Sequence, residues 1–204
     1  MPIKTIAFEG GEGSGKGTII KAIAKYLEEK GEKVIITREP GGTEIGEQIR
    51  AIILDSKNNK MTGKTEAMLF AACRSQLLDE FLKPILQENK EGYLLLDRYV
   101  YSSYVYQGVV KKVGVDTVKS INDIATEKWH PDMVFYLDVT PEIGLKRISD
   151  NKREVNRFDK EEMSFHYAVR EGYLKIAKEM NFIIIDADQT VENVLADIIK
   201  VIEN

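Results

Sequence analysis

An α/β fold, in which helices cover both faces of a parallel sheet, is the fold class that this sequence predicts. Short apolar segments alternate along the chain with longer amphipathic ones, and the apolar segments are continuous rather than polar at every second position. Strands of a parallel sheet are buried on both faces, so continuous apolar segments are typical of them. The regular alternation of strand-like and helix-like segments favours the same class.

The expected elements follow one another closely along the chain. The predicted strands are residues 3–8, 33–37, 93–96, 133–137 and 182–185. The predicted helices are residues 15–30, 44–54, 65–87 with a break or kink at Pro84, 102–127 with an interruption near Gly114, 141–148, 159–180 and 191–202. Neither a flexible linker nor a repeat divides the chain, so we expect one domain over residues 1–204. In such a sheet, ligands bind outside the carboxyl ends of the strands.

The composition excludes several classes of function. The 204 residues are 43% hydrophobic and 30% charged, with a net charge of −4, which argues against a duplex-DNA or membrane-surface protein. The one cysteine, Cys73, lies in an apolar segment and predicts packing in a reducing compartment. Neither a signal-peptide pattern nor a bilayer-spanning segment is present, so we expect a cytoplasmic protein without nucleic-acid or membrane partners. Trp129, His130 and His166 form no metal-ligand or triad pattern, and we assign them to packing or exposure.

A glycine-rich segment between the first predicted strand and helix has the pattern of a phosphate-binding loop. Its glycines let backbone N–H groups surround a phosphate, the helix dipole adds attraction, and Lys16 supplies a charge for the β- and γ-phosphates. A turn that merely joins strand to helix is the alternative, and the full spacing favours nucleotide binding. The predicted ATP contacts are Gly10, Gly11, Glu12, Gly13, Ser14, Gly15, Lys16, Gly17 and Thr18.

The loop departs from the usual pattern at a position that bears on metal binding. Most such loops place Ser or Thr after the lysine, where its hydroxyl reaches Mg²⁺, but here Gly17 follows and Thr18 comes next. A Gly-Thr pair also occurs there in adenylate kinases, so phosphotransfer is still expected. We therefore expect ATP phosphates, waters and carboxylates to hold the Mg²⁺ cofactor.

Asp97 and Arg98 follow the predicted strand at residues 93–96. Asp97 can hold a Mg²⁺-bound water or accept a proton, and Arg98 can clamp a phosphate with its planar fork of donors. A simple surface ion pair is the alternative, but the phosphate loop in the same sheet favours a catalytic pair. The segment at 151–154 lacks the final Asp of a guanine-reading motif, which argues against a regulatory GTPase.

Four segments together resemble the thymidylate kinase family, and the resemblance covers essentially the whole chain. They are residues 8–16 around the phosphate loop, 37–43 (Thr-Arg-Glu-Pro-Gly-Gly-Thr), 69–74 (Leu-Phe-Ala-Ala-Cys-Arg) and 97–108, which begins Asp-Arg-Tyr. The second and fourth, in this order and spacing, are highly specific. The resemblance implies a P-loop kinase fold with a five-stranded parallel sheet and a short lid. It also implies transfer of a phosphate from ATP to dTMP.

The resemblance implies a role for each residue of the acceptor site. Arg38 and Arg98, supported by Arg50, would hold the dTMP phosphate, while Glu9 and Asp97 would lie near the metal, mainly through water.

Other positions would read the base and the sugar. Phe70 would stack on thymine, and Arg74 would bond its carbonyl edge. Tyr106 would exclude a 2′-hydroxyl, and Glu12 would meet the 3′-hydroxyl. The remaining polar contacts to the base are assigned to Ser103 and Gln107. Taken singly, the two aromatic residues could be core residues and Arg74 a surface ion-pair partner.

The polar segment at residues 149–160 is predicted to be a lid. Phosphoryl transfer needs positive charge near the migrating group, and in some thymidylate kinases an arginine within the phosphate loop supplies it. That position is Gly13 here, so we expect Arg153, and second Arg157, to act as catalytic lid residues rather than as part of a solvated turn.

The adenine site leaves less trace in the sequence. Residues 187–189 resemble the backbone contact to the base, which involves Ala187 and Gln189, and Arg147 is expected to stack there.

Two other functions stay open, a deoxynucleoside kinase and a nucleotide-binding protein without turnover. Arg38 and Arg98, both aimed at an acceptor phosphate, favour a monophosphate substrate. The family also implies a homodimer built on the helix at 65–87, although the monomer could equally cover that apolar face.

Overall fold

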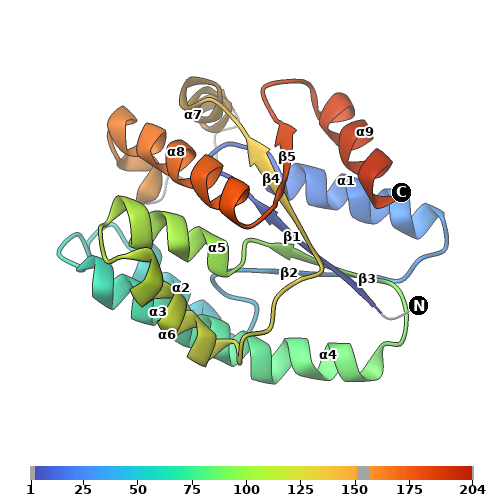
Figure 1. Ribbon diagram of the computed structural model, residues 1–204, viewed down its shortest axis with the longest axis horizontal. Coiled ribbons are helices and arrows are strands. Elements are labelled where there is room, and N and C mark those ends of the chain that lie inside the picture. The colour runs from blue at the N-terminus through green and yellow to red at the C-terminus, as the bar shows by residue number, and fades with distance from the viewer. Residues whose placement is uncertain (1–2, 151–156, 204) are drawn as a thin grey trace.

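A computed structural model describes residues 3–150 and 157–203, and its centre is a parallel sheet between two layers of helices (Figure 1). The strands are β1 (Lys4–Glu9), β2 (Val34–Arg38), β3 (Tyr93–Asp97), β4 (Met133–Asp138) and β5 (Ile183–Asp186). They form one five-stranded sheet in the order β2-β3-β1-β4-β5, and every neighbouring pair is parallel. The predicted fold class is confirmed.

Helices connect successive strands and cover both faces of the sheet. They are α1 (Lys16–Glu29), α2 (Glu44–Leu54), α3 (Gly63–Leu77), α4 (Lys83–Glu88), α5 (Val100–Ser103), α6 (Val115–Ala125), α7 (Pro141–Asp150), α8 (Met163–Glu179) and α9 (Val191–Ile202). Two π-helical segments, η1 (Leu78–Leu82) and η2 (Tyr104–Val110), and a 3₁₀ turn, η3 (Phe158–Lys160), complete the described elements. In the part of the chain that the structure describes, no helix has both the length and the apolar character to cross a membrane.

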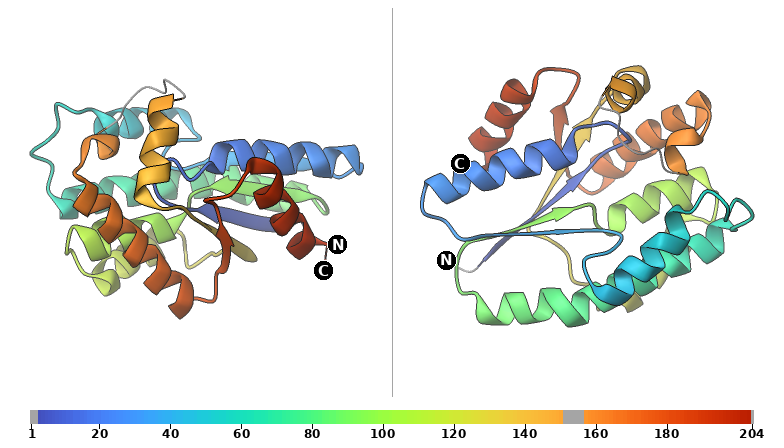
Figure 2. Two further views of the ribbon diagram at one scale, coloured as in Figure 1. Left: turned by 90° about the horizontal axis from the view of Figure 1, so that it is seen from above. Right: turned by 180° about the vertical axis from the view of Figure 1, so that it is seen from behind.

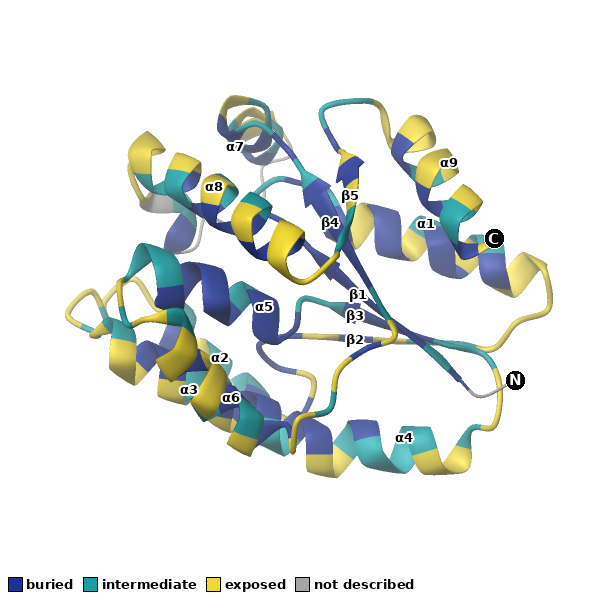
Figure 3. Ribbon diagram, viewed as in Figure 1, coloured by how far each residue is buried: buried dark blue, intermediate teal, exposed yellow. Residues whose placement is uncertain are grey.

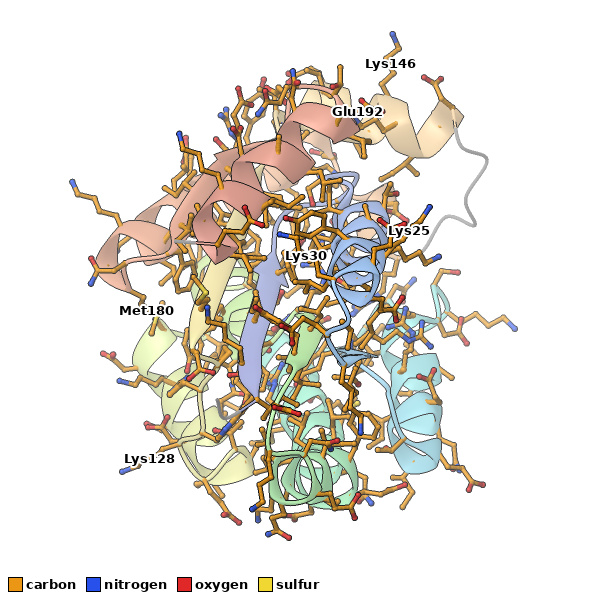
Figure 4. The ribbon with its side chains drawn as sticks, turned by 90° about the vertical axis from the view of Figure 1, so that its right-hand side faces the viewer. Lys25, Lys30, Lys128, Lys146, Met180 and Glu192 are labelled. Carbon is orange, nitrogen blue, oxygen red and sulfur yellow. The ribbon has the colours of Figure 1, made fainter. Side chains whose placement is uncertain are left out.

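The strands bury both of their faces, as their continuous apolar sequence predicts. On β1, Ile6 and Phe8 pack against α1 and α9, whereas Ala7 between them packs toward α3, α5 and α8. Figure 2 shows α1 and α9 on one side of the sheet and the larger helical layer, which includes α3 and α8, on the other. The dark buried stripes of α1 and α8 face the strands in Figure 3. Charged side chains such as Lys128 and Lys146 point away from the body of the molecule (Figure 4).

Three predicted helices differ from the observed ones in their interior or their start. The helical stretch from Gly63 does not break at Pro84; the π turn η1 comes before the proline, and α4 carries it in its first turn. A proline ring collides with the carbonyl four residues earlier in a regular helix, and the wider π turn relieves this collision. The predicted helix at 102–127 contains the π segment η2, and the one at 159–180 begins at Met163, after η3.

The strand order places the carboxyl ends of β1 and β3 side by side in the centre of the sheet. The chain leaves β1 toward α1 on one face and leaves β3 toward α5 on the other. Such a divergence opens a crevice at the carboxyl ends of the strands, where ligands bind in open α/β sheets.

Candidate active site

A cavity of about 750 Å³ opens at these strand ends, and its size falls in the range of small-ligand sites. We call one part of its lining the P-loop half; its predicted residues are Glu12, Gly13, Ser14, Gly15, Lys16, Gly17, Thr18, Arg147, Ala187 and Gln189. We call the other part the arginine half; its predicted residues are Arg38, Arg50, Phe70, Asp97, Arg98, Ser103, Tyr106 and Gln107. The predicted site residues outside this lining are Glu9, Gly10, Gly11, Arg74 and Arg157. Arg153 lies outside the described residues.

The first turn of α1 is open to a ligand, unlike the first turns of three other helices. Threonine side chains cap α2, α3 and α9 by accepting a hydrogen bond from an N–H of the first turn. Helix α1 instead begins after Gly15, which has a φ of 83° and provides no side-chain cap. Gly15, Lys16, Gly17 and Thr18 line the cavity, so the start of α1 and the positive end of its dipole lie beside it, as anion binding requires.

Lys16 lies across the phosphate loop. Its Nζ donates to the carbonyls of Gly10 and Gly11 at 3.1 and 3.2 Å and to Ser14 Oγ at 3.1 Å. Burial, and then the positive charge of Arg98, lowers the pKa of Lys16 to about 8. An anion beside the ammonium would oppose both effects, so this lysine is suited to bind phosphate.

The loop packs directly against α7 through two glycines. Gly13 has a φ of 71°, and a Cβ there would come within 2.0 Å of the Gly144 carbonyl oxygen. A Cβ on Gly144 would in turn meet the Glu12 carbonyl oxygen at 2.4 Å. This packing leaves no room for the loop arginine that some thymidylate kinases carry at the position of Gly13. By contrast, a Cβ on Gly17 would meet nothing within 4 Å.

Arg98 joins the two halves of the cavity. Its guanidinium donates to the Gly10 carbonyl at 2.9 Å, to Glu12 Oε1 at 3.1 Å and to Tyr173 OH at 3.1 Å. The residue has a φ of 70°, a left-handed conformation that costs a side-chain-bearing residue energy. The fold maintains this strained conformation at the end of β3, and the side chain is thereby directed at the phosphate loop.

Glu12 and Tyr106 meet at the same junction. The Tyr106 hydroxyl donates to Glu12 Oε1 at 3.2 Å, and the Arg98 guanidinium lies 5.5 Å from the centre of the Tyr106 ring. Tyr106 belongs to the π segment η2, whose wider turn sets the direction of this side chain. The three residues with predicted roles around the sugar and phosphate of the acceptor therefore form one connected cluster.

Glu9 supports this cluster from below. The carboxylate is fully buried and accepts from the Tyr99 backbone N–H at 2.8 Å, from Ser102 Oγ at 2.6 Å and from Tyr173 OH at 2.9 Å. Burial raises the pKa of Glu9, and Arg98 opposes the rise. Of the two carboxylates predicted near a metal, only Asp97 lines the cavity.

Two more arginines place positive charge in the arginine half. The Arg38 guanidinium donates to both carboxylate oxygens of Glu47, at 2.9 and 3.0 Å, and Arg50 donates to the Pro40 carbonyl at 2.7 Å. Burial, and then the charge of Arg38, lowers the pKa of Arg50. Two guanidinium groups held close together in a cavity favour the binding of an anion between them.

The base-reading residues divide into two groups. Phe70, Ser103 and Gln107 line the cavity, and the side chains of the latter two are buried. Arg74 is only 1% exposed and donates from Nε to Glu39 Oε2 at 2.6 Å, with a further hydrogen bond to Asn122. Direct contact between Arg74 and a base stays a prediction, whereas its ion pair with Glu39 positions the loop that carries Pro40.

Arg157, the described arginine of the predicted lid, is paired with Glu66 of α3. Glu66 is fully buried and also accepts from Gln107 Nε2 at 2.7 Å and Lys111 Nζ at 3.0 Å. The next residue, Phe158, lines the cavity and packs edge-on against Tyr106. The end of the predicted lid is thus attached to the arginine half.

At the opposite end of the cavity, Arg147 joins α7 to the connection between β5 and α9. Its guanidinium donates to the Ala187 carbonyl at 2.8 Å and to the Gln189 carbonyl at 3.1 Å. The structure therefore brings the predicted adenine residues together.

Sequence reasoning missed the buried partners of the site: Glu39, Glu66, Ser102 and Tyr173. Glu66, Ser102 and Tyr173 lie in predicted helices, and Glu39 follows β2 within the motif at 37–43, where the sequence assigns it no role. Acidic residues at apolar positions of a helix, such as Glu66 between Thr65 and Ala67, were the one available signal.

The parallel sheet, the phosphate loop and a continuous cavity with an arginine-lined acceptor half define a P-loop nucleoside monophosphate kinase. A family model described as thymidylate kinase matches residues 8–198. Thymidylate kinases from Geobacillus sp. and Bacillus pumilus are each 47% identical to the chain, covering 96% and 98% of it and 94% of their own length. One from Thermoanaerobacter sp. is 46% identical over 100% of this chain and 98% of its own length. The chain belongs to the thymidylate kinase family, and it is an ATP-dependent phosphotransferase.

Proposed function

We propose that this chain transfers the γ-phosphate of ATP to dTMP, giving ADP and dTDP for dTTP synthesis. The observation that carries the proposal is the continuous cavity, with Lys16 on its P-loop half, Arg38 and Arg50 on its arginine half, and Arg98 joining the two. A kinase for a free nucleoside needs no cationic cluster for an acceptor phosphate. The cluster therefore favours a monophosphate acceptor over the nucleoside.

In this mechanism the protein positions two phosphates and neutralises their charge. Lys16 and the open first turn of α1 hold the ATP phosphates, while Arg147, Ala187 and Gln189 lie around the adenine. The Arg38, Arg50 and Arg98 side chains hold the dTMP phosphate so that its oxygen attacks the γ-phosphorus in line. Glu12 meets the 3′-hydroxyl, and Tyr106 crowds the position of a 2′-hydroxyl.

We include Mg²⁺ as the cofactor, because it neutralises the phosphate oxygens in such transfers. The described residues contain no group of three His, Cys, Asp or Glu side chains that could hold a metal. This fits an ion held by ATP phosphates and waters, with Asp97 as the carboxylate nearest to it in the cavity. The buried Glu9 acts on this region through Ser102 and Tyr173.

We further propose that the segment at 149–160 is a lid within one kinase domain spanning residues 1–204. Gly13 has no space for an arginine, so the lid supplies the charge for the migrating phosphoryl group. Arg153 is the first candidate. For Arg157 to contribute, its guanidinium must leave the ion pair with Glu66 and bind the phosphate instead.

A homodimer belongs to the same proposal. Ile45 and Ile52 on α2 and Met68 on α3 are about half exposed, and the two helices pack against each other. Exposed apolar side chains gathered on neighbouring helices are typical of an interface. Light scattering of the wild type and Met68→Asp tests this, since the mutation should shift a dimer toward monomer. A cytoplasmic location stays a prediction from composition.

The reaction is tested by following ADP release from Mg²⁺–ATP with dTMP, dUMP, dCMP, AMP, GMP or thymidine as the acceptor. We expect strong turnover with dTMP, weaker turnover with dUMP and almost none with the others. Turnover with thymidine but not dTMP would support the deoxynucleoside kinase. ATP binding without turnover on any acceptor would support a non-catalytic nucleotide-binding protein.

A further inference from the structure

We propose that Glu66 is a specificity-determining positioning residue: it fixes the Gln107 amide so that the acceptor base must carry an N–H at ring position 3. The inference rests on the proposed function, because it assumes that a pyrimidine nucleotide occupies the arginine half. Glu66 itself does not line the cavity; it acts through Gln107, which does.

The contacts of Glu66 leave one orientation for the Gln107 amide. Gln107 is fully buried, and its Nε2 lies 2.7 Å from Glu66 Oε1. A carboxylate only accepts hydrogen bonds, so the amide must turn its NH₂ group toward Glu66. The amide oxygen is thereby directed away from the carboxylate.

The amide oxygen of Gln107 is a buried hydrogen-bond acceptor without a donor among the described residues. Gln107 Oε1 has no hydrogen-bond partner among the described residues, and the same is true of the neighbouring Ser103 Oγ. Both residues line the cavity where Phe70 provides an aromatic face. Leaving a buried acceptor unpaired costs free energy, so a ligand that donates to it gains a large advantage over one that does not.

The bases differ at the atom that would meet this acceptor. Thymine and uracil carry an N–H at ring position 3, whereas cytosine carries a lone pair there and would be repelled by the amide oxygen. A site built to hydrogen-bond a substrate N–H rejects analogues without it strongly. The Glu66–Gln107 pair therefore excludes cytosine nucleotides and leaves the choice between thymine and uracil to other contacts.

Two cations hold the Glu66 carboxylate in place. Lys111 Nζ lies 3.0 Å from Glu66 Oε2, and Arg157 donates to the same oxygen. Because the cations occupy Oε2, Oε1 remains for Gln107.

The test is Glu66→Gln, compared with the wild type in equilibrium binding of dTMP and dCMP. The substituted amide can donate as well as accept, so Gln107 can turn over and offer its NH₂ group to cytosine. We expect the preference for dTMP over dCMP to fall about tenfold or more, through weaker dTMP binding and tighter dCMP binding. An unchanged preference, or equal weakening of both ligands, would overturn the proposal.

Two further variants exclude a merely structural effect. Lys111→Met removes a cation from the same carboxylate but leaves the Gln107 bond, and should keep the preference within a few-fold of the wild type. Gln107→Leu should remove the preference, and adding Glu66→Gln to it should change nothing more. If Glu66→Gln does not fold, Gln107→Leu decides, since a retained preference for dTMP sinks the proposal. Binding is measured apart from turnover, so an inactive wild type that still prefers dTMP refutes the reaction and not this inference.

Discussion

The P-loop half and the arginine half of the cavity, which we propose to bind the phosphates of donor and acceptor, are built from different parts of the chain. The P-loop half presents backbone N–H groups, glycines and one lysine, and Arg147 on its far side donates to the backbone carbonyls of Ala187 and Gln189. In and beside the arginine half, carboxylates fix the arginine side chains: the partly buried Glu12 pairs with Arg98 of the lining. The buried Glu39 and Glu66 pair with Arg74 and Arg157, which lie outside the lining. The first half depends on backbone conformation, and the second on the satisfaction of buried charges.

The comparison predicts the largest effect for a side chain added to the P-loop half. Gly13→Ala places a Cβ within 2.0 Å of the Gly144 carbonyl oxygen at a φ of 71°. We expect a loss of about 4 kcal/mol or more in the free energy of unfolding, measured by urea denaturation. Gly17→Ala is the matched control: its Cβ meets nothing within 4 Å, and alanine should stabilise the start of α1 by up to about 1 kcal/mol. Equal effects of the two substitutions would contradict the packing described here.

The arginine half should be most sensitive where one member of a buried ion pair is removed. Arg74→Met leaves Glu39, which is 6% exposed, without its cation. We expect a loss of about 3 kcal/mol in the free energy of unfolding, again by urea denaturation. Adding Glu39→Gln should restore part of this loss, because the unpaired charge is then absent. If the double variant is as unstable as the sum of the two single ones, the pair is not coupled in the way that the structure indicates.

The sequence predicts the P-loop half more completely than the arginine half. Glycine spacing and the position of Lys16 after a strand encode backbone geometry directly, so nearly all of the P-loop half was predicted. The sheet was predicted for the same kind of reason, because the apolar strands must be buried on both faces.

Buried ion pairs join residues far apart in the chain, and the identity of one residue does not predict its partner. Glu66 and Arg157 are 91 positions apart, and Arg74 was expected to face a ligand, whereas its described hydrogen bonds are to protein groups. The π segment that directs Tyr106 and Gln107 also has no signal in a helical apolar pattern, because it changes the residues per turn. Only the family resemblance pointed to those two residues.

A substitution at Arg98 tests whether the junction between the two halves needs the planar guanidinium group or only its positive charge. Arg98→Lys keeps the charge but cannot donate at once to the Gly10 carbonyl, Glu12 and Tyr173, as the arginine does. We expect kcat/KM for dTMP to fall about a hundredfold, which is about 2.7 kcal/mol, with steady-state assays as the measurement. Ser120→Ala on the exposed side of α6 is a control that should leave kcat/KM unchanged. A loss below threefold for Arg98→Lys would show that charge alone suffices.

The smallest expected effect is a pH dependence confined to the P-loop half. Burial and the charge of Arg98 lower the pKa of Lys16 to about 8, so its positive charge is lost progressively as the pH rises through 8. ATP affinity should therefore fall about twofold between pH 7 and 8 and more steeply above pH 8, by less than tenfold per pH unit. Calorimetric titration of ATP at several pH values measures this, and Lys16→Met should remove the dependence. The arginines stay charged throughout this range, so dTMP affinity should change far less between pH 8 and 9. A parallel decline of both affinities would mean that the pH dependence arises from the whole site and not from Lys16.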